Sequence, residues 1–232
     1  MKKIILYIFL CLPLLGQSQT VDAHVWTGLG LSYKINKKIS VDYKTQTRFY
    51  KNASVLRVYF NQIGGSFKIT DDFKVGLDYR FSRKRKNDAY FVSENRYMIN
   101  AIYGYSVKPI NMKFSVRARY QNGFDRLSTI NNVITPNIYN VFRLKLIAKY
   151  KNPDFKRVQP FLGYEMFKSL NREPIKFGIN THRIKAGVVL DLPKKNEVKL
   201  SYIYQKNNGF TQEIRHIYAI QYSYSLNALL SK

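Results

Sequence analysis

The sequence predicts an all-β protein, an up-and-down antiparallel transmembrane β-barrel of about 10–12 strands with its apolar face outward. The first observation is that apolar and polar residues alternate over stretches of nine or ten residues. A period of two places successive side chains on opposite faces of a strand. The second is that no apolar run after residue 16 approaches the roughly 20 residues of a membrane-spanning helix. The third is that the polar face holds charges of both signs in mid-strand, which suits a hydrated lumen.

The first eighteen residues have the layout of a secretory signal peptide. Lys2 and Lys3 precede an apolar core, Ile4–Leu15, and small residues follow the core. An N-terminal membrane anchor is disfavoured because this core is short. We therefore predict a signal peptide over residues 1–18 and a single β-barrel domain over residues 19–232. The only cysteine, Cys11, lies in the predicted signal peptide, so the mature chain would have no disulfide and no thiol chemistry.

Eleven stretches with the alternating pattern follow one another after residue 23. In Phe73–Ser82 every odd-numbered residue is apolar and every even-numbered residue is small or polar, and Met112–Gln121 repeats the pattern with opposite parity. The parity of the third stretch changes near Gly64 and Gly65, which predicts a β-bulge there. The predicted strands are 24–34, 39–50, 55–69, 73–82, 90–105, 112–121, 142–150, 158–167, 183–192, 199–205 and 213–226.

The connections between these stretches fall into two classes. Those after odd-numbered strands are tight and rich in Asn, Asp, Lys and Pro, whereas those after even-numbered strands are mostly longer, as in 83–88, 122–137 and 168–181. Outer-membrane barrels have short periplasmic turns and longer outer loops. With the tight turns on the periplasmic side, ten strands close consistently, and the stretch 24–34 becomes an eleventh. Because bacterial barrels usually have even strand numbers, this stretch lies either in the wall in an unusual way or in the lumen, unless a strand is missing from the count.

The two faces of the predicted strands have different chemistry. A soluble secreted β-protein would also alternate, with its apolar residues inside. The nearly unbroken apolar face matches the roughly 9–11 residues that a tilted strand needs to cross a bilayer, which favours the membrane barrel. Aromatic residues on this face gather near the strand ends, where we predict two lipid-facing belts. The belts consist of Tyr33, Tyr105, Tyr150 and Tyr224 next to the tight turns or the C-terminus, and of Phe49, Phe81, Tyr120 and Tyr204 next to the longer loops.

The charged residues on the other face are predicted to surround the lumen. They are Arg48, Arg80, Glu94, Arg117, Arg119, Arg143, Lys145, Glu165, Arg183, Lys185, Asp191 and Arg215. The basic members would line an anion-favouring pathway, or they would neutralise the acidic members and fill the interior. The sequence leaves both alternatives open.

At this level of detail the chain resembles a known family. The patterns VWTGLGLSYKINKKISVDYKTQTRF (Val25–Phe49), VGLDYRFSRKR (Val75–Arg85) and PFLGYEMF (Pro160–Phe167) resemble the domain-of-unknown-function family DUF2490, as do the closing segments KLSYIYQ and IYAIQYSYSL. The resemblance implies an exported outer-membrane barrel from a Bacteroidota-type bacterium. It implies no catalytic residue, because the family has no established function. The chain departs from barrels that end on an aromatic residue, since Asn227–Lys232 extends past Leu226.

The charge balance bears on the partners. The chain has 39 Lys and Arg against 14 Asp and Glu, a formal net charge of +25. We expect no nucleic-acid partner, because the chain is predicted to be exported and its aromatic residues do not share a face with the basic ones. Basic loop residues, such as Arg83 to Lys86, would instead meet outer-membrane lipid phosphates. The sequence therefore predicts a non-enzymatic protein of the Gram-negative outer membrane, after signal-peptide cleavage, that binds or passes small anionic solutes through a basic lumen.

A lipid-modifying barrel enzyme with a rim histidine is the alternative from another class. It would require His182 with Ser169, or His216 with Thr211, at the outer rim. No acidic residue at a suitable spacing accompanies either pair, and His24 is the only other histidine of the predicted mature chain. No group of His, Asp and Glu has metal-ligand spacing, so we predict no metal site and no cofactor.

Overall fold

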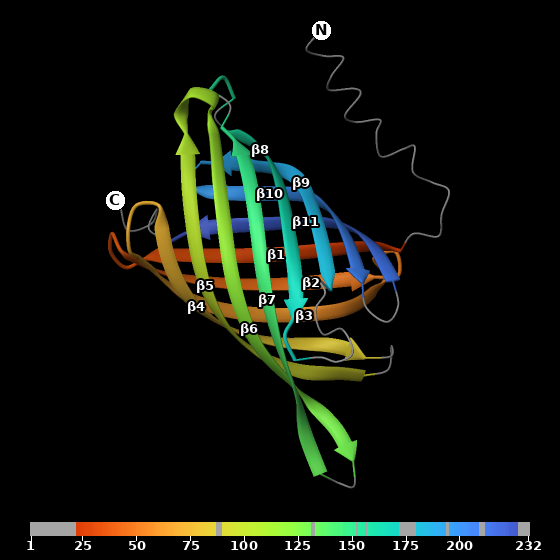
Figure 1. The fold of residues 1–232 in the computed structure, drawn as a ribbon. Coiled ribbons are helices and arrows are strands. Elements are labelled where there is room, and N and C mark those ends of the chain that lie inside the picture. Colours follow the sequence, from red (N-terminus) through yellow and green to blue (C-terminus); the bar gives the residue numbers. More distant parts are fainter. Residues whose placement is uncertain are drawn as a thin grey trace.

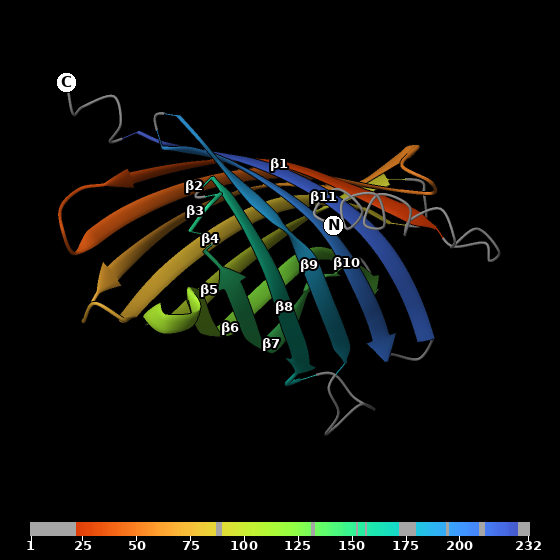
Figure 2. The ribbon, with the colours of Figure 1, turned by 90° about the horizontal axis from the view of Figure 1, so that it is seen from above.

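The computed structural model of the chain describes residues 22–86, 90–130, 133–151, 153–155, 157–171, 180–193, 195–208 and 212–226, without the side chains of 126–137 and 212. The predicted signal peptide lies outside the described residues. The predicted fold class is confirmed, because the described strands form one closed barrel of eleven strands (Figure 1, Figure 2). No helix among the described residues has the length and apolarity needed to cross a membrane.

The strand bounds follow the alternating stretches and extend several of them. They are β1 (Ala23–Lys34), β2 (Ile39–Tyr50), β3 (Val55–Lys68), β4 (Phe73–Lys86), β5 (Tyr90–Val107), β6 (Met112–Ile130), β7 (Val133–Tyr150), β8 (Val158–Ser169), β9 (Thr181–Leu192), β10 (Asn196–Asn208) and β11 (Gln212–Ser225). One turn of 3₁₀ helix, η2 (Lys108–Ile110), lies between β5 and β6.

The stretch whose place the sequence left open lies in the wall of the barrel. Strand β1 pairs antiparallel with β2 and parallel with β11. In the parallel ladder Val25 lies opposite Tyr218 and Ser32 lies opposite Ser225. An odd number of strands in up-and-down order makes one parallel pair unavoidable, because the first and last strands then run in the same direction. The barrel thus closes with eleven strands, within the predicted range of 10–12.

The outward face is strongly apolar. Leu77, Ile99 and Leu162 expose 66%, 57% and 58% of their surface. The neighbouring residues of β4 and β8, Asp78 and Gly163, point inward by the alternation of the strand. Large apolar side chains this exposed leave the outer face without a polar covering, as expected where lipid is the solvent.

The inward face combines polar and apolar side chains. The buried apolar residues of the described chain are Phe60, Val92, Met98, Phe161, Val189, Ile203 and Ile217. By the ladder registers all seven share the inward side of the sheet with the charged residues. The core of the molecule therefore lies inside the barrel, in agreement with a narrow lumen filled by side chains.

The predicted position of the β-bulge is wrong. No bulge occurs at Gly64 and Gly65, since both residues continue the ladders to β2 and β4 without a break. The irregularity lies between Arg48 and Phe49, where Arg57 of β3 is the extra residue. Beyond that point Leu56 takes the outward place opposite Phe49, so the bulge keeps the apolar stripe on the outer face.

The predicted difference in loop length is also wrong for most hairpins. Strands β4 and β6 continue to Lys86 and Ile130, so much of the predicted connections 83–88 and 122–137 is strand. Only the connection between β8 and β9 is long among those that follow even-numbered strands. We call the barrel end that carries this connection the loop end. The opposite end, which carries the turns after β1, β3, β5, β7 and β9, is the turn end.

A charge pair stabilises one connection at the turn end. Lys68 Nζ donates to Asp71 Oδ1 at 2.5 Å, within the turn between β3 and β4. This contact holds the pKa of the Asp71 carboxyl below its usual range, because the ammonium group favours the charged form.

Candidate functional site

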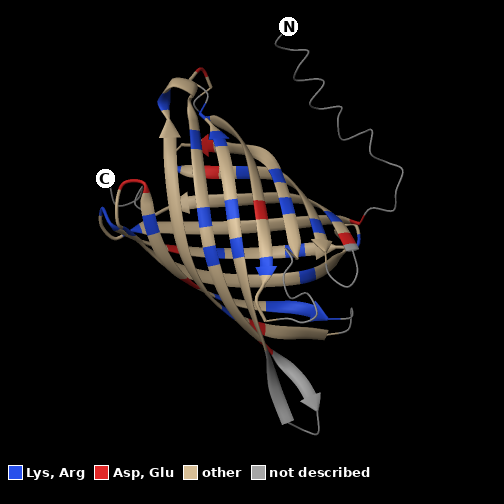
Figure 3. Cartoon of the chain, in the orientation of Figure 1, with Lys and Arg blue, Asp and Glu red and all other residues tan. Residues whose placement is uncertain are grey.

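A basic cavity lies in the middle of the barrel. Its volume is about 240 Å³. Eleven Lys and Arg side chains line it against one carboxylate, Glu165, so its walls are strongly positive. Figure 3 shows the corresponding band of basic residues along the middle of the strands. The basic lining residues are Lys44, Arg48, Arg80, Arg96, Arg117, Arg119, Arg143, Lys145, Arg183, Lys185 and Lys199.

The twelve residues predicted to face the lumen all occupy inward positions of the ladders. Nine of them line the central cavity. The other three are Glu94, which pairs with Arg96, Asp191 near the turn end, and Arg215 towards the loop end. The predicted list left out three basic lining residues, Lys44, Arg96 and Lys199. Lys199 lies between the outward residues Val198 and Leu200, and this pattern could have identified it.

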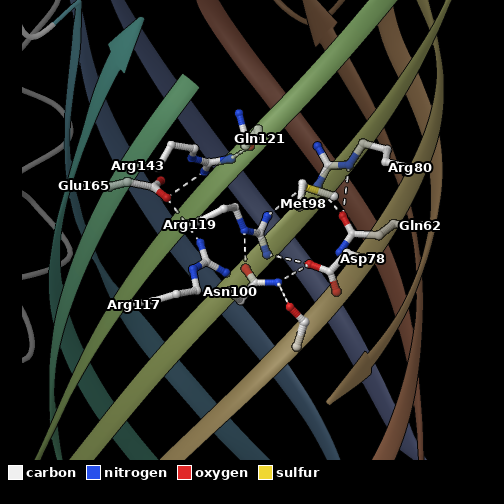
Figure 4. Close-up of polar contacts among 11 residues, drawn as sticks. Gln62, Asp78, Arg80, Met98, Asn100, Arg117, Arg119, Gln121, Arg143 and Glu165 are labelled. Carbon is white, nitrogen blue, oxygen red and sulfur yellow. Dashed lines mark hydrogen bonds and ion pairs between the residues drawn. The ribbon is translucent and has the colours of Figure 1, made fainter. Parts of the chain in front are cut away.

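Glu165 is the anionic centre of the cavity wall. Its carboxylate accepts from Arg143 Nη2 at 2.6 Å and from Arg117 Nη2 at 3.3 Å (Figure 4). It also lies 3.5 Å from Arg183 Nη1. Strands β6, β7 and β9 supply these three arginines, and β8 supplies the carboxylate. One negative charge thus organises guanidinium groups from three strands, and the network spans four neighbouring strands.

A second network fixes Arg119. Its Nη2 donates to Asp78 Oδ2 at 2.8 Å, and its Nε donates to Asn100 Oδ1 at 2.5 Å. Asn100 Nδ2 in turn donates to Asp78 Oδ2 at 2.9 Å (Figure 4). Nearby, Arg80 Nη2 donates to Gln62 Oε1 at 2.5 Å. Because Gln62 is neutral, this contact leaves the charge of Arg80 without a counter-ion.

Guanidinium groups and aromatic rings alternate across the lumen. Arg183 lies 4.5 Å from the centre of the Phe167 ring and 5.3 Å from that of Trp26. Arg48 continues the row, 3.9 Å from the centre of the Trp26 ring and 5.2 Å from that of the Phe60 ring. Cation–π contacts of this kind hold desolvated guanidinium groups in place. The complete row is Arg143, Phe167, Arg183, Trp26, Arg48, Phe60 and Arg80.

Several donors around the cavity lack an acceptor. Within the described part of the chain, Lys145 and Lys185 make no hydrogen bond or ion pair. The Nε atoms of Arg117 and Arg143 are buried without a hydrogen-bond partner. Lys44 donates to the neutral Gln221 Oε1 at 2.7 Å. A cavity with this excess of donors and positive charge is chemically complementary to an anion.

The comparison with protein families agrees with the resemblance found in the sequence. The model of the family described as "Protein of unknown function (DUF2490)" matches residues 23–215. The chain belongs to this family. The eleven-stranded barrel with its basic cavity is therefore the structure of a DUF2490 protein.

Two solved structures resemble this DUF2490 barrel. The beta domain of the Bordetella autotransporter BrkA shares 12% sequence identity over 77% of this chain and 78% of that chain, with a TM-score of 0.47. A chain from a study of the in-meso crystallization of membrane proteins shares 15% identity over 83% of this chain and 79% of that chain, with a TM-score of 0.40. No curated protein matches the chain.

One of the two histidine pairs proposed for a barrel enzyme, His182 with Ser169, does not form in the DUF2490 barrel. His182 is opposite Met166 on the outward side, whereas Ser169 is opposite Val141 on the inward side. Thr211, the proposed partner of His216, lies outside the described residues. His24 is buried, with Nε2 at 3.2 Å from Asp22 Oδ2. Within the described ranges, no group of three or more His, Cys, Asp and Glu residues could hold a metal ion.

The eight residues predicted to form aromatic belts all occupy outward positions. Tyr105, Tyr120 and Tyr150 are exposed, and Tyr33 and Tyr224 are half-buried. These residues form contacts on the outer face and contribute nothing to the cavity.

Proposed function

We propose that this DUF2490 protein spans the outer membrane of a Gram-negative bacterium and holds a small anionic solute in its central cavity. The observation on which the proposal rests is the charge of the cavity wall, eleven basic residues against the single carboxylate of Glu165. An unpaired charge removed from water is costly unless a counter-charge accompanies it. A bound anion would supply that counter-charge.

The outer face supports the membrane location. In the described strands every outward position lacks Asp and Glu, and the acidic strand residues point inward. The exposed apolar side chains of neighbouring strands form a continuous band, including Ile63, Leu77 and Ile99 on β3, β4 and β5. Such a face is stable in lipid and would aggregate in water.

The interior supports binding more strongly than free passage. The row of arginines and aromatic rings crosses the lumen at the level of the cavity, from Arg143 to Arg80. Buried apolar residues such as Val189 and Ile217 occupy further inward positions. The cavity is consequently bounded by side chains whose contacts fix them to the wall.

The natural fluorescence of the protein offers a direct test, because Trp26 is the only tryptophan and lines the cavity. The folded protein in phosphatidylcholine vesicles is titrated with pyrophosphate, and sodium chloride at equal ionic strength corrects for screening. We expect a saturable change of Trp26 emission. Lys145→Gln should weaken binding by about tenfold, since a hydrogen bond to a charged group contributes about 1.5–3 kcal/mol.

Lys108→Gln is the matched control, because it removes one positive charge from an exposed turn away from the cavity. It should bind pyrophosphate as the unmodified protein does. Equal weakening by both substitutions, or a response explained by ionic strength alone, would overturn the anion site. Conductance in planar bilayers distinguishes passage from holding. If the unmodified protein carries a steady anion-selective current and Arg143→Glu abolishes it, the protein transports anions and does not merely hold them.

A further inference from the structure

A ring of hydrogen-bonded side chains surrounds the outer face of the barrel. Each of the five hairpins β2–β3, β4–β5, β6–β7, β8–β9 and β10–β11 contributes one pair, formed by a tyrosine of the first strand and an Asn or His of the second. The pairs are Tyr43–Asn61 (2.7 Å), Tyr79–Asn95 (2.7 Å), Tyr120–Asn140 (3.0 Å), Tyr164–His182 (2.6 Å) and Tyr202–His216 (2.5 Å).

The five pairs share one geometry. In the β4–β5 ladder Tyr79 lies opposite Tyr97, and its partner Asn95 lies two residues further towards the loop end. The same diagonal relates Tyr164 to His182 in the β8–β9 ladder. His182 and His216 therefore occupy the places that Asn residues hold in the other three hairpins. This repetition gives the rim histidines a role in the barrel wall that requires no catalysis.

The ring marks a boundary on the outer face. An outward amide or imidazole in contact with hydrocarbon is costly unless it is hydrogen-bonded, and tyrosine is most stable where hydrocarbon meets headgroups. On the turn-end side of the ring, the outward residues of β9 are apolar from Ile184 to Leu192. On β9 the ring is thus the border of the apolar face at the loop end.

Outward positive charge occurs beyond this border. Lys206 of β10 lies opposite His182 and the exposed Ile214, and Lys168 of β8 lies opposite the exposed Phe142, so both lysines are on the outer face. Neither lysine makes a hydrogen bond or ion pair within the described part of the chain. The described outward positions contain no carboxylate, so the described part of the chain offers these lysines no counter-charge.

We propose that Lys168 and Lys206, with His182 between them, bind the phosphate group of an anionic lipid in the leaflet at the loop end. His182 is opposite Met166 of β8, and Lys168 lies two residues further towards the loop end on that strand. The three side chains therefore face one lipid-sized stretch of the surface, immediately outside the apolar band. The two lysines lie on the strands that flank β9 on either side, and a phosphate over β9 would be attracted by both. This proposal rests on the membrane location above and is independent of the anion in the central cavity.

The same geometry corrects the expectation for the basic stretch Arg83 to Lys86. These four residues belong to β4, and its alternation divides them between the two faces, with Arg83 and Arg85 outward. Arg85 Nε donates to the Leu56 carbonyl oxygen at 3.1 Å, and its guanidinium lies 4.8 Å from the Phe91 ring centre. Its contacts with the wall make it a weaker candidate for a lipid phosphate than Lys168 and Lys206.

The test measures lipid binding by native mass spectrometry on detergent-purified, delipidated protein. Phosphatidic acid is the anionic probe, and phosphatidylcholine is the zwitterionic one. The unmodified protein should retain phosphatidic acid in preference to phosphatidylcholine. Lys168→Gln/Lys206→Gln should weaken phosphatidic acid binding by roughly 30-fold, because each lysine at an anionic surface contributes about fivefold.

Lys108→Gln/Lys151→Gln is the matched control, since it removes two exposed lysines at the turn end. It should leave binding within about twofold of the unmodified protein, because lipids at the loop end lie beyond the range of these charges. Equal binding by the two double variants would overturn the lipid site. Extraction of the unmodified protein from vesicles by carbonate would instead overturn the membrane location itself. If the protein stays in the membrane and pyrophosphate still changes Trp26 emission, a negative lipid result would count against the lipid site alone.

Discussion

Replacing Glu165 by glutamine tests whether one carboxylate organises the basic interior. The side chain is nearly buried, with 8% of the residue exposed, and it contacts Arg143, Arg117 and Arg183 at 2.6, 3.3 and 3.5 Å. Glutamine keeps the size and one acceptor oxygen but removes the charge. The three guanidinium groups would then face one another without a counter-ion. We expect a large loss of stability from this single substitution.

The magnitude follows from the burial of the arginines. Removing one partner of a buried ion pair costs about 3–5 kcal/mol, because the remaining charge stays desolvated. Three arginines share this carboxylate, so the upper part of that range is expected for the free energy of unfolding. With a urea dependence of about 2 kcal/mol per molar, the midpoint of unfolding would fall by about 2 M.

The assay is urea unfolding in phosphatidylcholine vesicles, followed by the emission of Trp26, which lies 5.3 Å from Arg183 across the row of rings and guanidinium groups. Glu197→Gln is the control, because Glu197 is also an inward strand carboxylate but makes no ion pair within the described chain. Glu197 lies opposite Asp191, so its neutralisation should leave stability unchanged or slightly raised. Equal midpoints for the two variants would refute the central role of Glu165.

Two further predictions concern the wall. Gly187→Ala should destabilise the barrel by about 1–3 kcal/mol, because the added Cβ would overlap the Leu200 carbonyl oxygen and lie 2.8 Å from Ser201 Cα. Gly65→Ala is the control and should leave stability unchanged, because a Cβ there meets nothing within 4 Å. The urea midpoints of the two variants check both expectations. Tyr79→Phe should cost about 1 kcal/mol through the lost bond to Asn95, and Tyr103→Phe, whose hydroxyl makes no bond within the described chain, should cost less; a smaller effect for Tyr79 would contradict the ring.

The sequence predicts the faces of the barrel well because alternation is a consequence of strand geometry. Leu77 and Asp78 must point to opposite sides wherever a strand forms, so the lumen residues follow once the apolar stripe is assigned to lipid. The same parity places Phe161 and Phe167 inward with Glu165, so these two aromatic residues do not belong to the outer belts. The ladders therefore agree with the sequence wherever the pattern is regular.

Contacts across the lumen could not be predicted from the pattern. Arg183 of β9 and Trp26 of β1 meet because β10 and β11 place small or aliphatic residues such as Ala219 between them. Which residues face one another at one level depends on strand tilt and on the diameter of the closed barrel. The position of the bulge could not be predicted either, because an arginine such as Arg57 is equally common at regular strand positions.

The parallel seam between β1 and β11 shows how an odd barrel closes. Parallel pairing is slightly less stable per residue than antiparallel pairing, so closure at this seam requires additional contacts. Gly28 and Gly30 of β1 supply the necessary space, since a Cβ at Gly30 would lie 3.2 Å from Ser223 Oγ. The space above these glycines lets Lys44 of β2 reach over β1 and donate to Gln221 of β11 at 2.7 Å. A side-chain bond thus joins the two strands that flank β1, and the glycines of the first stretch make this bond possible.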